Sequence, residues 1–242
     1  MMRKKFILLG VFSTLFCVSV YAQTFEEKRT IYPVVVNEGQ RVINGFQLFG
    51  GQTDECIFAN AMKWAINEFC NDKRDQMFDI QVNKKTFSVN MQLEYTAAGK
   101  VKYVFDNKAN VKVIDGKLVY TFYDITYRTN SLLPFSSVSS IDKLNPEKKP
   151  KHKEIISAFE ELASKKINLM FDAVVGNHCA EITHWDDINI QRAVKGMNAD
   201  ECFLAFGKPS NSYEDNHNRI QWSYGLNFVL IFKEGKVETI IR

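Results

Sequence analysis

The 242-residue sequence lacks the residue patterns by which most catalytic centres are recognised. It contains only four histidines, no Cys-x-x-Cys pair and no His-Glu-x-x-His motif, which argues against the common zinc and thiol redox sites. His178 and Cys179 are adjacent, but sequence neighbours rarely orient as a thiolate–imidazolium pair, and no nucleophile signature surrounds them. We therefore expect no catalytic residue and no cofactor site, and a hydrolase that uses Cys179 or the His178/His184 region is the weakest hypothesis.

A second group of polar residues is of the types that can bind a metal ion. His178, Glu181, His184, Asp186 and Asp187 fall within one short stretch, yet their spacing matches no established ligand motif. Asp186 and Asp187 instead suit the first turn of a helix, where carboxylates stabilise the free N–H groups. The sequence therefore predicts no metal site here.

Long apolar runs are absent after the first twenty residues, and the N-terminus predicts export. Arg3-Lys4-Lys5 forms a charged region, residues 6–20 form an apolar region, and Val20-Tyr21-Ala22 suits cleavage by signal peptidase. We expect a signal peptide at residues 1–22 and a mature protein that is periplasmic or outer-membrane-associated. An uncleaved anchor is the alternative, and lipidation of Cys17 is disfavoured by the bulky Phe16 before it.

The mature chain has no excess of either charge. Loss of Arg3, Lys4 and Lys5 leaves 28 basic and 28 acidic residues, which removes the electrostatic argument for a nucleic-acid partner. A short lysine run within residues 148–153 is either a solvated linker or a contact with anionic lipid, so membrane association without an anchor stays open.

The four remaining cysteines leave their redox state open. Cys56 and Cys70 are predicted on one helix about 21 Å apart, too far to pair. A bridge between Cys179 and Cys202 is compatible with an oxidising compartment. The alternative is that these side chains act as small buried apolar groups.

Residues 23–175 predict a first α+β domain. Strands are expected at 31–36 and 42–49, followed by a helix that Thr53 caps and that runs to about Cys70. Further strands are expected at 77–82, 86–95, 101–105, 111–114 and 118–127, with Asp115-Gly116 as a strong hairpin signal. Residues 130–152 are expected to form a segment without regular secondary structure. A second amphipathic helix is expected at 153–174.

One antiparallel sheet with both helices on one face would bury the two apolar helix stripes. This layout, with the strand from Leu118 to Ile125, resembles a family of exported domains of unknown function with a TATA-binding-protein-like fold. The resemblance covers roughly residues 31–175 and implies a fold, not DNA binding.

Residues 176–242 predict a second, smaller domain. Asn198 and Glu201 form a capping box that begins a helix, and Gly207 and Pro209 end it. Three strands are expected at 220–224, 227–232 and 237–241. The run Gly196-Met197, Phe206-Gly207-x-Pro209, Trp222-x-Tyr224-Gly225 and a final Phe-x-x-Gly-Lys-Val resembles the SmpA/OmlA/BamE-like family of envelope domains. That resemblance implies an ααβββ fold and an accessory interaction role without catalysis.

Aromatic residues on predicted strands give the candidate interaction surface. The strand at 118–127 has apolar side chains on both faces, so we expect one face to pack on the helices and the other on a partner, a ligand or the second domain. The candidate residues are Tyr120, Phe122, Tyr123, Tyr127 and, in the second domain, Tyr224, whereas Trp222 is expected in the core.

Together these patterns predict an exported, non-enzymatic cell-envelope protein that acts as a protein-interaction or scaffold module, with an unidentified envelope protein as its partner. The alternative is a periplasmic enzyme inhibitor or small-ligand-binding protein, since the BamE-like fold resembles that of proteinaceous β-lactamase inhibitors.

Overall fold

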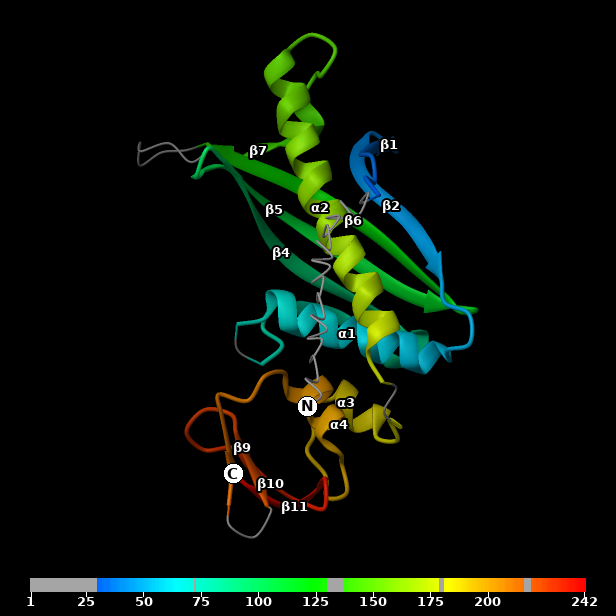
Figure 1. Cartoon of the computed structure of the whole chain (residues 1–242), viewed down its shortest axis with the longest axis vertical. Coiled ribbons are helices and arrows are strands. Elements are labelled where there is room, and N and C mark those ends of the chain that lie inside the picture. Colours follow the sequence, from blue (N-terminus) through cyan, green and yellow to red (C-terminus); the bar gives the residue numbers. More distant parts are fainter. Residues whose placement is uncertain (1–29, 72, 130–136, 179–180, 216–218) are drawn as a thin grey trace, which may run out of the picture.

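A computed structural model describes residues 30–242 apart from 72, 130–136, 179–180 and 216–218. The predicted signal peptide, Cys17 and Cys179 lie outside the described residues. Within them, an antiparallel sheet packs against two helices, and a smaller unit of helices and strands lies at one end (Figure 1).

The larger part of the chain builds a seven-stranded sheet. Its strands are β1 (Val35–Asn37), β2 (Gln40–Leu48), β3 (Met77–Gln81), β4 (Thr86–Ala97), β5 (Lys100–Ile114), β6 (Lys117–Thr129) and β7 (Ser139–Ser140). The order is β1-β2-β6-β5-β4-β3, and β7 pairs with β6. The paired strands run antiparallel, as the alternating sequence pattern predicts.

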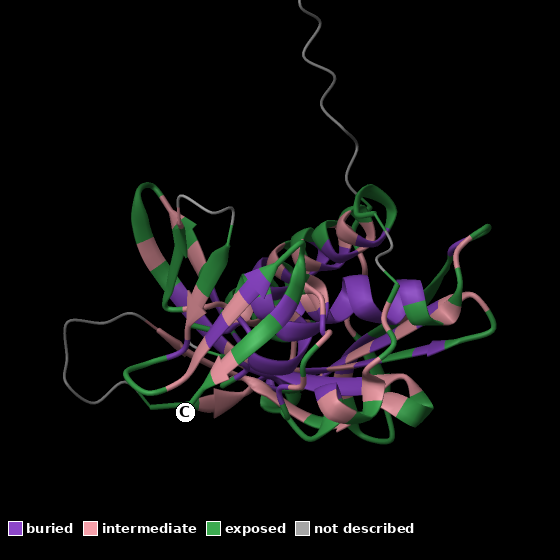
Figure 2. Ribbon diagram, turned by 90° about the horizontal axis from the view of Figure 1, so that it is seen from below, coloured by how far each residue is buried: buried purple, intermediate pink, exposed green. Residues whose placement is uncertain are grey.

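Helices α1 (Asp54–Phe69) and α2 (Pro150–Gly176) cover one face of this sheet (Figure 1). The Thr53 hydroxyl accepts a hydrogen bond from the N–H of Cys56, and Asp54 and Glu55 occupy the first turn, so α1 begins where the sequence predicts. Ile57 of α1 and Phe159 and Ile167 of α2 are fully buried. Figure 2 shows the buried segments gathered between helices and sheet, with the turns exposed. No helix of the described residues covers the other face of the sheet (Figure 1), and we call it the open face.

The segment predicted to be irregular contributes to this core. Residues 130–136 lie outside the described part, but β7 and a 3-10 helix, η2 (Ile141–Lys143), follow it. Ile141 and Leu144 are buried. The sequence expectation was wrong for this half of the segment, because two apolar side chains among polar neighbours suffice to tie it to the core.

Two predicted strands are one continuous strand. The sequence predicts breaks between Phe105 and Val111, where polar residues predominate, but β5 runs unbroken from Lys100 to Ile114. It is paired with β4 on one side and β6 on the other. Ladder hydrogen bonds from both neighbours outweigh the low strand propensity of the polar stretch.

Strand β6 contains a bulge that changes which side chains face the helices. Between Asp106↔Thr126 and Lys108↔Tyr123 the register shifts, and Asp124 has a positive φ of 52°. The extra residue reverses the alternation beyond this point. Tyr127 therefore lies on the helix side with its ring 6.4 Å from that of Phe105, not on the face opposite Tyr120 as simple alternation predicts.

The C-terminal unit contains helices α3 (Trp185–Asn189) and α4 (Ala199–Phe206) and a four-stranded sheet. Its strands are β8 (Asn211–Glu214), β9 (Ile220–Ser223), β10 (Val229–Lys233) and β11 (Lys236–Ile241), in the order β11-β10-β9-β8. The predicted capping box of Asn198 and Glu201 is confirmed. The sequence predicts a polar loop where β8 forms, because its exposed side chains carry no apolar alternation.

The two units pack closely against each other. Phe58 of α1 contacts Trp185 of α3, with ring centroids 5.6 Å apart. Lys63 forms an ion pair with Asp200 at 2.7 Å, and the buried Arg74 donates from Nη1 to the carbonyl oxygen of Leu204 at 3.0 Å. The buried side chains of both units form one continuous cluster.

The cysteines differ in state. Cys56 is disulfide-bonded. Cys70 and Cys202 are free and buried, so the predicted alternative of a Cys179–Cys202 bridge is wrong. Burial raises the pKa of the Cys202 thiol to about 12, and Cys202 therefore behaves as a small apolar group.

The expected roles of Trp222 and Tyr224 are corrected as well. Tyr224 is buried, stacks on Phe228 at 5.4 Å and donates from its hydroxyl to the carbonyl oxygen of Gly207. Trp222 is half-buried against Phe232. Tyr224 therefore belongs to the core of the unit, because β9 ends beside α4 and turns this side chain inward.

We expect Tyr224→Leu to lower the free energy of unfolding by about 1–3 kcal/mol, since ring packing and a buried hydrogen bond are lost. Tyr213→Leu, at an exposed position of the same sheet, is the matched control and should change stability by about 0.5 kcal/mol or less. Urea denaturation of both variants measures the difference. Equal stability of the two would place Tyr224 outside the core.

Candidate functional site

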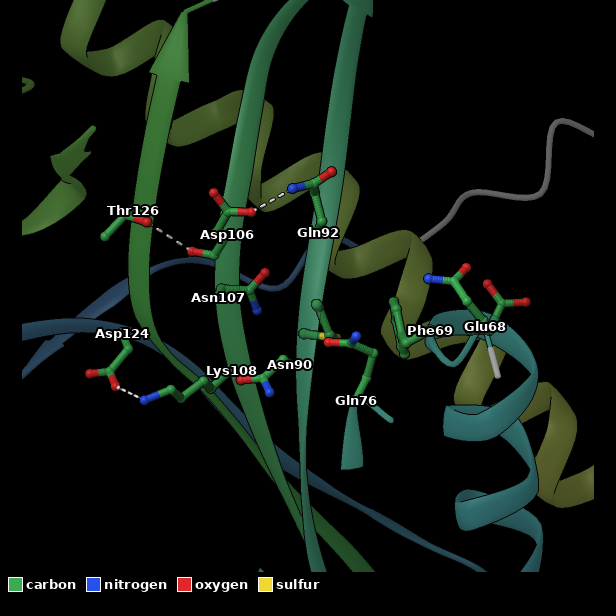
Figure 3. A pocket seen from close by; sticks show the side chains of 12 residues that line it. Glu68, Phe69, Gln76, Asn90, Gln92, Asp106, Asn107, Lys108, Asp124 and Thr126 are labelled. Carbon is green, nitrogen blue, oxygen red and sulfur yellow. Dashed lines mark hydrogen bonds and ion pairs between the residues drawn. The ribbon is translucent and has the colours of Figure 1, made fainter. Parts of the chain in front are cut away.

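A polar cavity of about 570 Å³ lies where α1 ends and β3 begins, and residues of β4, β5 and β6 also line it (Figure 3). Strand β3 pairs with β4 only as far as the hydrogen bond from Asn90 N–H to the Gln76 carbonyl oxygen. Beyond Asn90, no described strand pairs with this edge of β4. The cavity therefore sits at an interruption in the sheet edge.

Carboxamide side chains dominate the polar lining. They come from the loop after α1, from the residue before β3, and from β4 and β5. These side chains are Asn71, Gln76, Asn90, Gln92 and Asn107. Each amide presents a donor and an acceptor side by side, which gives the cavity many hydrogen-bonding groups without net charge.

The charged residues in the lining are already paired. Asp106 accepts hydrogen bonds from Arg128 at 2.7 Å and from Gln92 at 2.7 Å (Figure 3 draws the second). Lys108 lies 2.8 Å from Asp124, and this hydrogen bond raises the pKa of Lys108.

Glu68, at the end of α1, also has a cationic partner. Its carboxylate pairs with Lys166 of α2 at 2.5 Å. Every carboxylate in the lining is paired with a cationic side chain. The cavity therefore has little electrostatic preference for a charged ligand.

Asn107 is the exception among the polar lining residues. It is 4% exposed, and neither its Oδ1 nor its Nδ2 has a hydrogen-bond partner in the described part of the chain. Along β5 it alternates with Asp106 and Lys108, so it belongs to the buried row of Phe105 and Ala109. An unpaired buried amide destabilises the folded state by about 1–3 kcal/mol per group.

The bulge in β6 lies directly beside Asn107. Asp124 and Ile125 occupy the position opposite it, between the two registers of the β5–β6 pair. Bulges next to binding sites redirect side chains, and here Asp124 reaches Lys108 on the open face. Phe69 and Met91 supply the apolar part of the lining.

The residue types in the lining are mainly carboxamides and paired charges. Within the cavity lining there is no cysteine, serine or histidine that could serve as a nucleophile with its base. Across the part of the chain that the structure describes, no group of three or more His, Cys, Asp or Glu side chains could hold a metal ion. No described helix is long and apolar enough to span a bilayer.

The predicted interaction residues lie elsewhere. Tyr120, Phe122 and Tyr224 are buried in the core, so the expectation that they form an interaction surface is wrong. They face the helices, and burial raises the pKa of Tyr120 to about 12. Tyr127 is half-buried on the same side. Only Tyr123 lies on the open face, beneath Lys108 with 6.0 Å between the ammonium and the ring centroid.

The sequence of β5 itself contains a signal for the cavity. In a continuous β5, the inward positions read Tyr103, Phe105, Asn107, Ala109 and Val111. Asn107 is the single polar residue in this apolar row. Because the sequence was divided into two strands at this stretch, the interrupted alternation was not visible.

The open face also carries exposed apolar side chains at the end away from the cavity. Phe46 and Leu48 of β2 are 61% and 57% exposed, and Ile114 of β5 is 43% exposed. Register places them on one face, since Phe46 pairs with Val119 and both Leu48 and Ile114 pair with Lys117. We call Phe46, Leu48 and Ile114 the apolar strip.

Comparison with known proteins supports the fold of the larger unit. No family model and no curated protein matches the sequence. The crystal structure of a TBP-like protein from Parabacteroides distasonis ATCC 8503 matches with a TM-score of 0.51 and 15% identity, over 60% of this chain and 99% of that one. This likeness supports the TATA-binding-protein-like fold predicted for the N-terminal part, and at this identity it shows the fold alone.

A second solved structure is also similar. A DUF4468 family protein from Bacteroides ovatus ATCC 8483 matches with a TM-score of 0.44 and 14% identity, over 62% of this chain and 94% of that one.

Proposed function

We propose that this chain is an exported, non-enzymatic binding module of the cell envelope, and that it recognises a protein partner through the apolar strip on the open face. The N-terminal charged and apolar regions and the cleavage site near Ala22 support export. The disulfide bond of Cys56 also supports an oxidising compartment.

The apolar strip is the observation that carries the proposal. Phe46 and Leu48 are more than half exposed and Ile114 is 43% exposed, and exposed apolar side chains that adjoin on one face mark interaction sites. Farther along the open face lie the polar side chains of Asn90, Gln92 and Lys108, and Tyr123 there is covered by Lys108. The strip is thus a local feature and not a general property of this face.

The surroundings of the strip indicate the chemistry of the partner. Lys117 lies over the ring of Phe46 at 5.8 Å, and Lys112 projects from β5 on the same face. A partner surface with an apolar centre would pack on the apolar strip, and an acidic rim around that centre would form ion pairs with the two lysines. A protein surface of this kind fits better than a nucleic acid, because cleavage after Ala22 would leave no excess of basic residues.

We expect the double variant Phe46→Ser/Leu48→Ser to lose its envelope partner while its stability changes by no more than about 1 kcal/mol, since both side chains are exposed. The measurement is cross-linked affinity purification of the tagged mature protein from envelopes, followed by mass spectrometry. Circular dichroism melting verifies that the variant is folded.

A matched control lies on the neighbouring hairpin. Val35 and Val36 of β1 are also exposed, but they lie outside the strip. Val35→Ser/Val36→Ser should retain the partner. Retention by both double variants, or recovery of no stoichiometric partner by the wild type, would contradict the proposal.

For the C-terminal unit we propose a BamE-like accessory role that positions the larger unit in the envelope. Support comes from the capping box at Asn198, the helix that precedes it and the following antiparallel strands, although β8 adds a strand to the ααβββ pattern. Enzyme inhibition rests on fold analogy only.

A role in small-ligand binding is the second candidate function, and the polar cavity of about 570 Å³ with its carboxamide lining favours it.

A further inference from the structure

We infer that a second cavity, at the junction of the two units, binds an anionic amphiphile of the fatty-acid class, with one hydrocarbon chain and one carboxylate. This junction cavity has a volume of about 650 Å³, within the range of about 300–1,000 Å³ that small-ligand sites occupy. Lys73 lines it from the loop after α1, Phe206 from the end of α4 and Arg242 from the position after β11, and the turn between β9 and β10 supplies most of the rest. It shares no described lining residue with the polar cavity and includes no residue of the apolar strip.

Three aromatic rings line the junction cavity. Phe206 packs against Phe228 with ring centroids 4.9 Å apart, and Tyr224 lies 5.5 Å from Phe206 and 5.4 Å from Phe228. Phe206 and Tyr224 are buried, whereas Phe228 is half-buried and presents ring surface to the cavity. A hydrocarbon chain that covers this surface removes apolar area from water, and the favourable free energy grows with that area.

Leu226 adds an apolar side chain at the edge of the junction cavity. It is 100% exposed and lies in the turn between β9 and β10, directly after Gly225 with its φ of +73°. A single exposed leucine is ordinary on a protein surface, but this one lines a cavity that also contains three aromatic rings. Leu226 is therefore placed to cover the part of a hydrocarbon chain that the rings leave in contact with water.

Two cationic side chains line the same cavity without an acidic partner. Lys73 and Arg242 are exposed, and no ion pair among the described residues involves either of them. No aspartate or glutamate of the described residues lines the cavity. The Arg242 guanidinium lies 5.5 Å from the centroid of the Phe228 ring, so positive charge and apolar surface adjoin. A carboxylate on a hydrocarbon chain matches this combination, because guanidinium and ammonium groups form charge-assisted hydrogen bonds with carboxylates.

Other classes of ligand match this lining less well. The side chain of Gln191 donates to the carbonyl oxygen of Ala205 at 3.3 Å, and Asn227 is the only other carboxamide in the described lining. A saccharide would therefore meet few hydrogen-bonding groups, and an extended peptide would leave most of its backbone N–H and C=O groups unpaired. A cationic amphiphile would lie beside two charges of its own sign.

The experiment is isothermal titration calorimetry of the mature protein with octanoate, 1,2-octanediol and octylamine, which share one chain length and differ in the charge of the head group. We expect octanoate to bind with a Kd of about 1 mM or tighter. The neutral diol and the cationic amine should bind at least about tenfold more weakly, because neither forms ion pairs with Lys73 and Arg242.

Two variants separate the charged contacts from the apolar ones. Lys73→Gln/Arg242→Gln should weaken octanoate binding by about tenfold or more, so that octanoate and 1,2-octanediol bind equally. Leu226→Ser should weaken the binding of both ligands, because it removes apolar contact and leaves the charges in place. All three side chains are exposed, and an unchanged melting temperature verifies that the variants are folded.

The matched control is Lys195→Gln/Lys236→Gln, which removes two exposed cations of the same unit from outside the described lining. It changes the net charge by the same amount and should bind octanoate like the wild type. The inference is overturned if octanoate does not bind, if the wild type binds octanoate and 1,2-octanediol equally, or if Lys73→Gln/Arg242→Gln keeps the wild-type affinity. Binding of N-acetyl-Gly-Leu in place of octanoate would assign the cavity to a peptide carboxylate and would overturn it too. None of these outcomes affects the partner test with Phe46 and Leu48.

Discussion

Gly207→Ala is expected to lower the free energy of unfolding by more than about 4 kcal/mol, an unusually large effect for the addition of one methyl group. A Cβ at this position would lie 1.8 Å from the carbonyl oxygen and 2.1 Å from the carbonyl carbon of Lys73. These are backbone atoms held by an antiparallel bridge between Lys73 and Lys208, so no side-chain rotation relieves the overlap. Gly207 also has a φ of +79°, which an alanine adopts at a cost.

The position of Gly207 explains why so much depends on it. Its N–H donates to the carbonyl oxygen of Phe203 and ends α4, and its own carbonyl accepts from the Tyr224 hydroxyl. The methyl group would push the C-terminal unit away from the chain segment after α1. We therefore expect the contacts between the two units to weaken together with the C-terminal core.

The control is Gly196→Ala, where φ is +90° and no atom lies within 4 Å of the added methyl group. This variant bears the conformational strain alone, about 1–2 kcal/mol. Urea denaturation monitored by tryptophan fluorescence gives both values. If the two glycine variants lose equal stability, the close approach to Lys73 contributes nothing.

Glu201→Ala is expected to lower the free energy of unfolding by about 3–5 kcal/mol, because it removes a buried carboxylate that accepts several hydrogen bonds. The carboxylate is 1% exposed. It accepts hydrogen bonds from the N–H groups of Thr183 at 2.6 Å, His184 at 3.0 Å and Asn198 at 2.8 Å. The Nδ1 of His184 lies 3.0 Å from the second carboxylate oxygen.

The same carboxylate makes stability depend on pH. Burial acts to raise the pKa of Glu201, but the hydrogen bonds from Asn198, Thr183 and His184 outweigh it, and the pKa lies below its ordinary value of 4.5. A lowered pKa in the folded state means that the unfolded chain binds the proton first as the pH falls. The stabilisation is thus present above pH 4.5 and is lost as the pH falls below it through the folded pKa.

The pH dependence is tested by urea denaturation of the wild type and Glu201→Gln between neutral and acidic pH. The wild type should lose more stability than Glu201→Gln as the pH falls below 4.5, since glutamine does not titrate. Glu181→Gln, at an exposed position, serves as the control and should follow the wild-type curve. Parallel curves for the wild type and Glu201→Gln would show that this carboxylate is not linked to folding.

Much of the local structure follows from the sequence because its causes are local. Thr53 caps α1, Asn198 and Glu201 form a capping box, and the alternation from Phe87 to Tyr95 produces a strand with one buried row. The two amphipathic stripes and the predicted antiparallel strands already required a sheet with helices on one face. Each of these features depends on residues within about one turn or one hairpin of each other.

The burial of the predicted interaction residues does not follow from local sequence patterns. The apolar residues on both faces of one strand predict Tyr120 and Phe122 at an interaction surface, and the frequency of tyrosine at interfaces predicts Tyr224 there, yet all three are buried. Which side of a strand faces the helices depends on register, and the bulge at Asp124 reverses it within β6. A bulge of this kind arises from pairing with β5, which the sequence of β6 does not reveal.

The sequence by itself determined most of the helices and strands, their caps and the absence of familiar catalytic motifs, because these depend on composition and short-range spacing. Only the tertiary structure decided that β5 is continuous, that Asn107 is buried beside a cavity with its amide unpaired, and that Phe46, Leu48 and Ile114 form one strip. Those features bring together residues far apart in the chain, and the hydrogen bonds and packing that hold them exist only once the strands are in register.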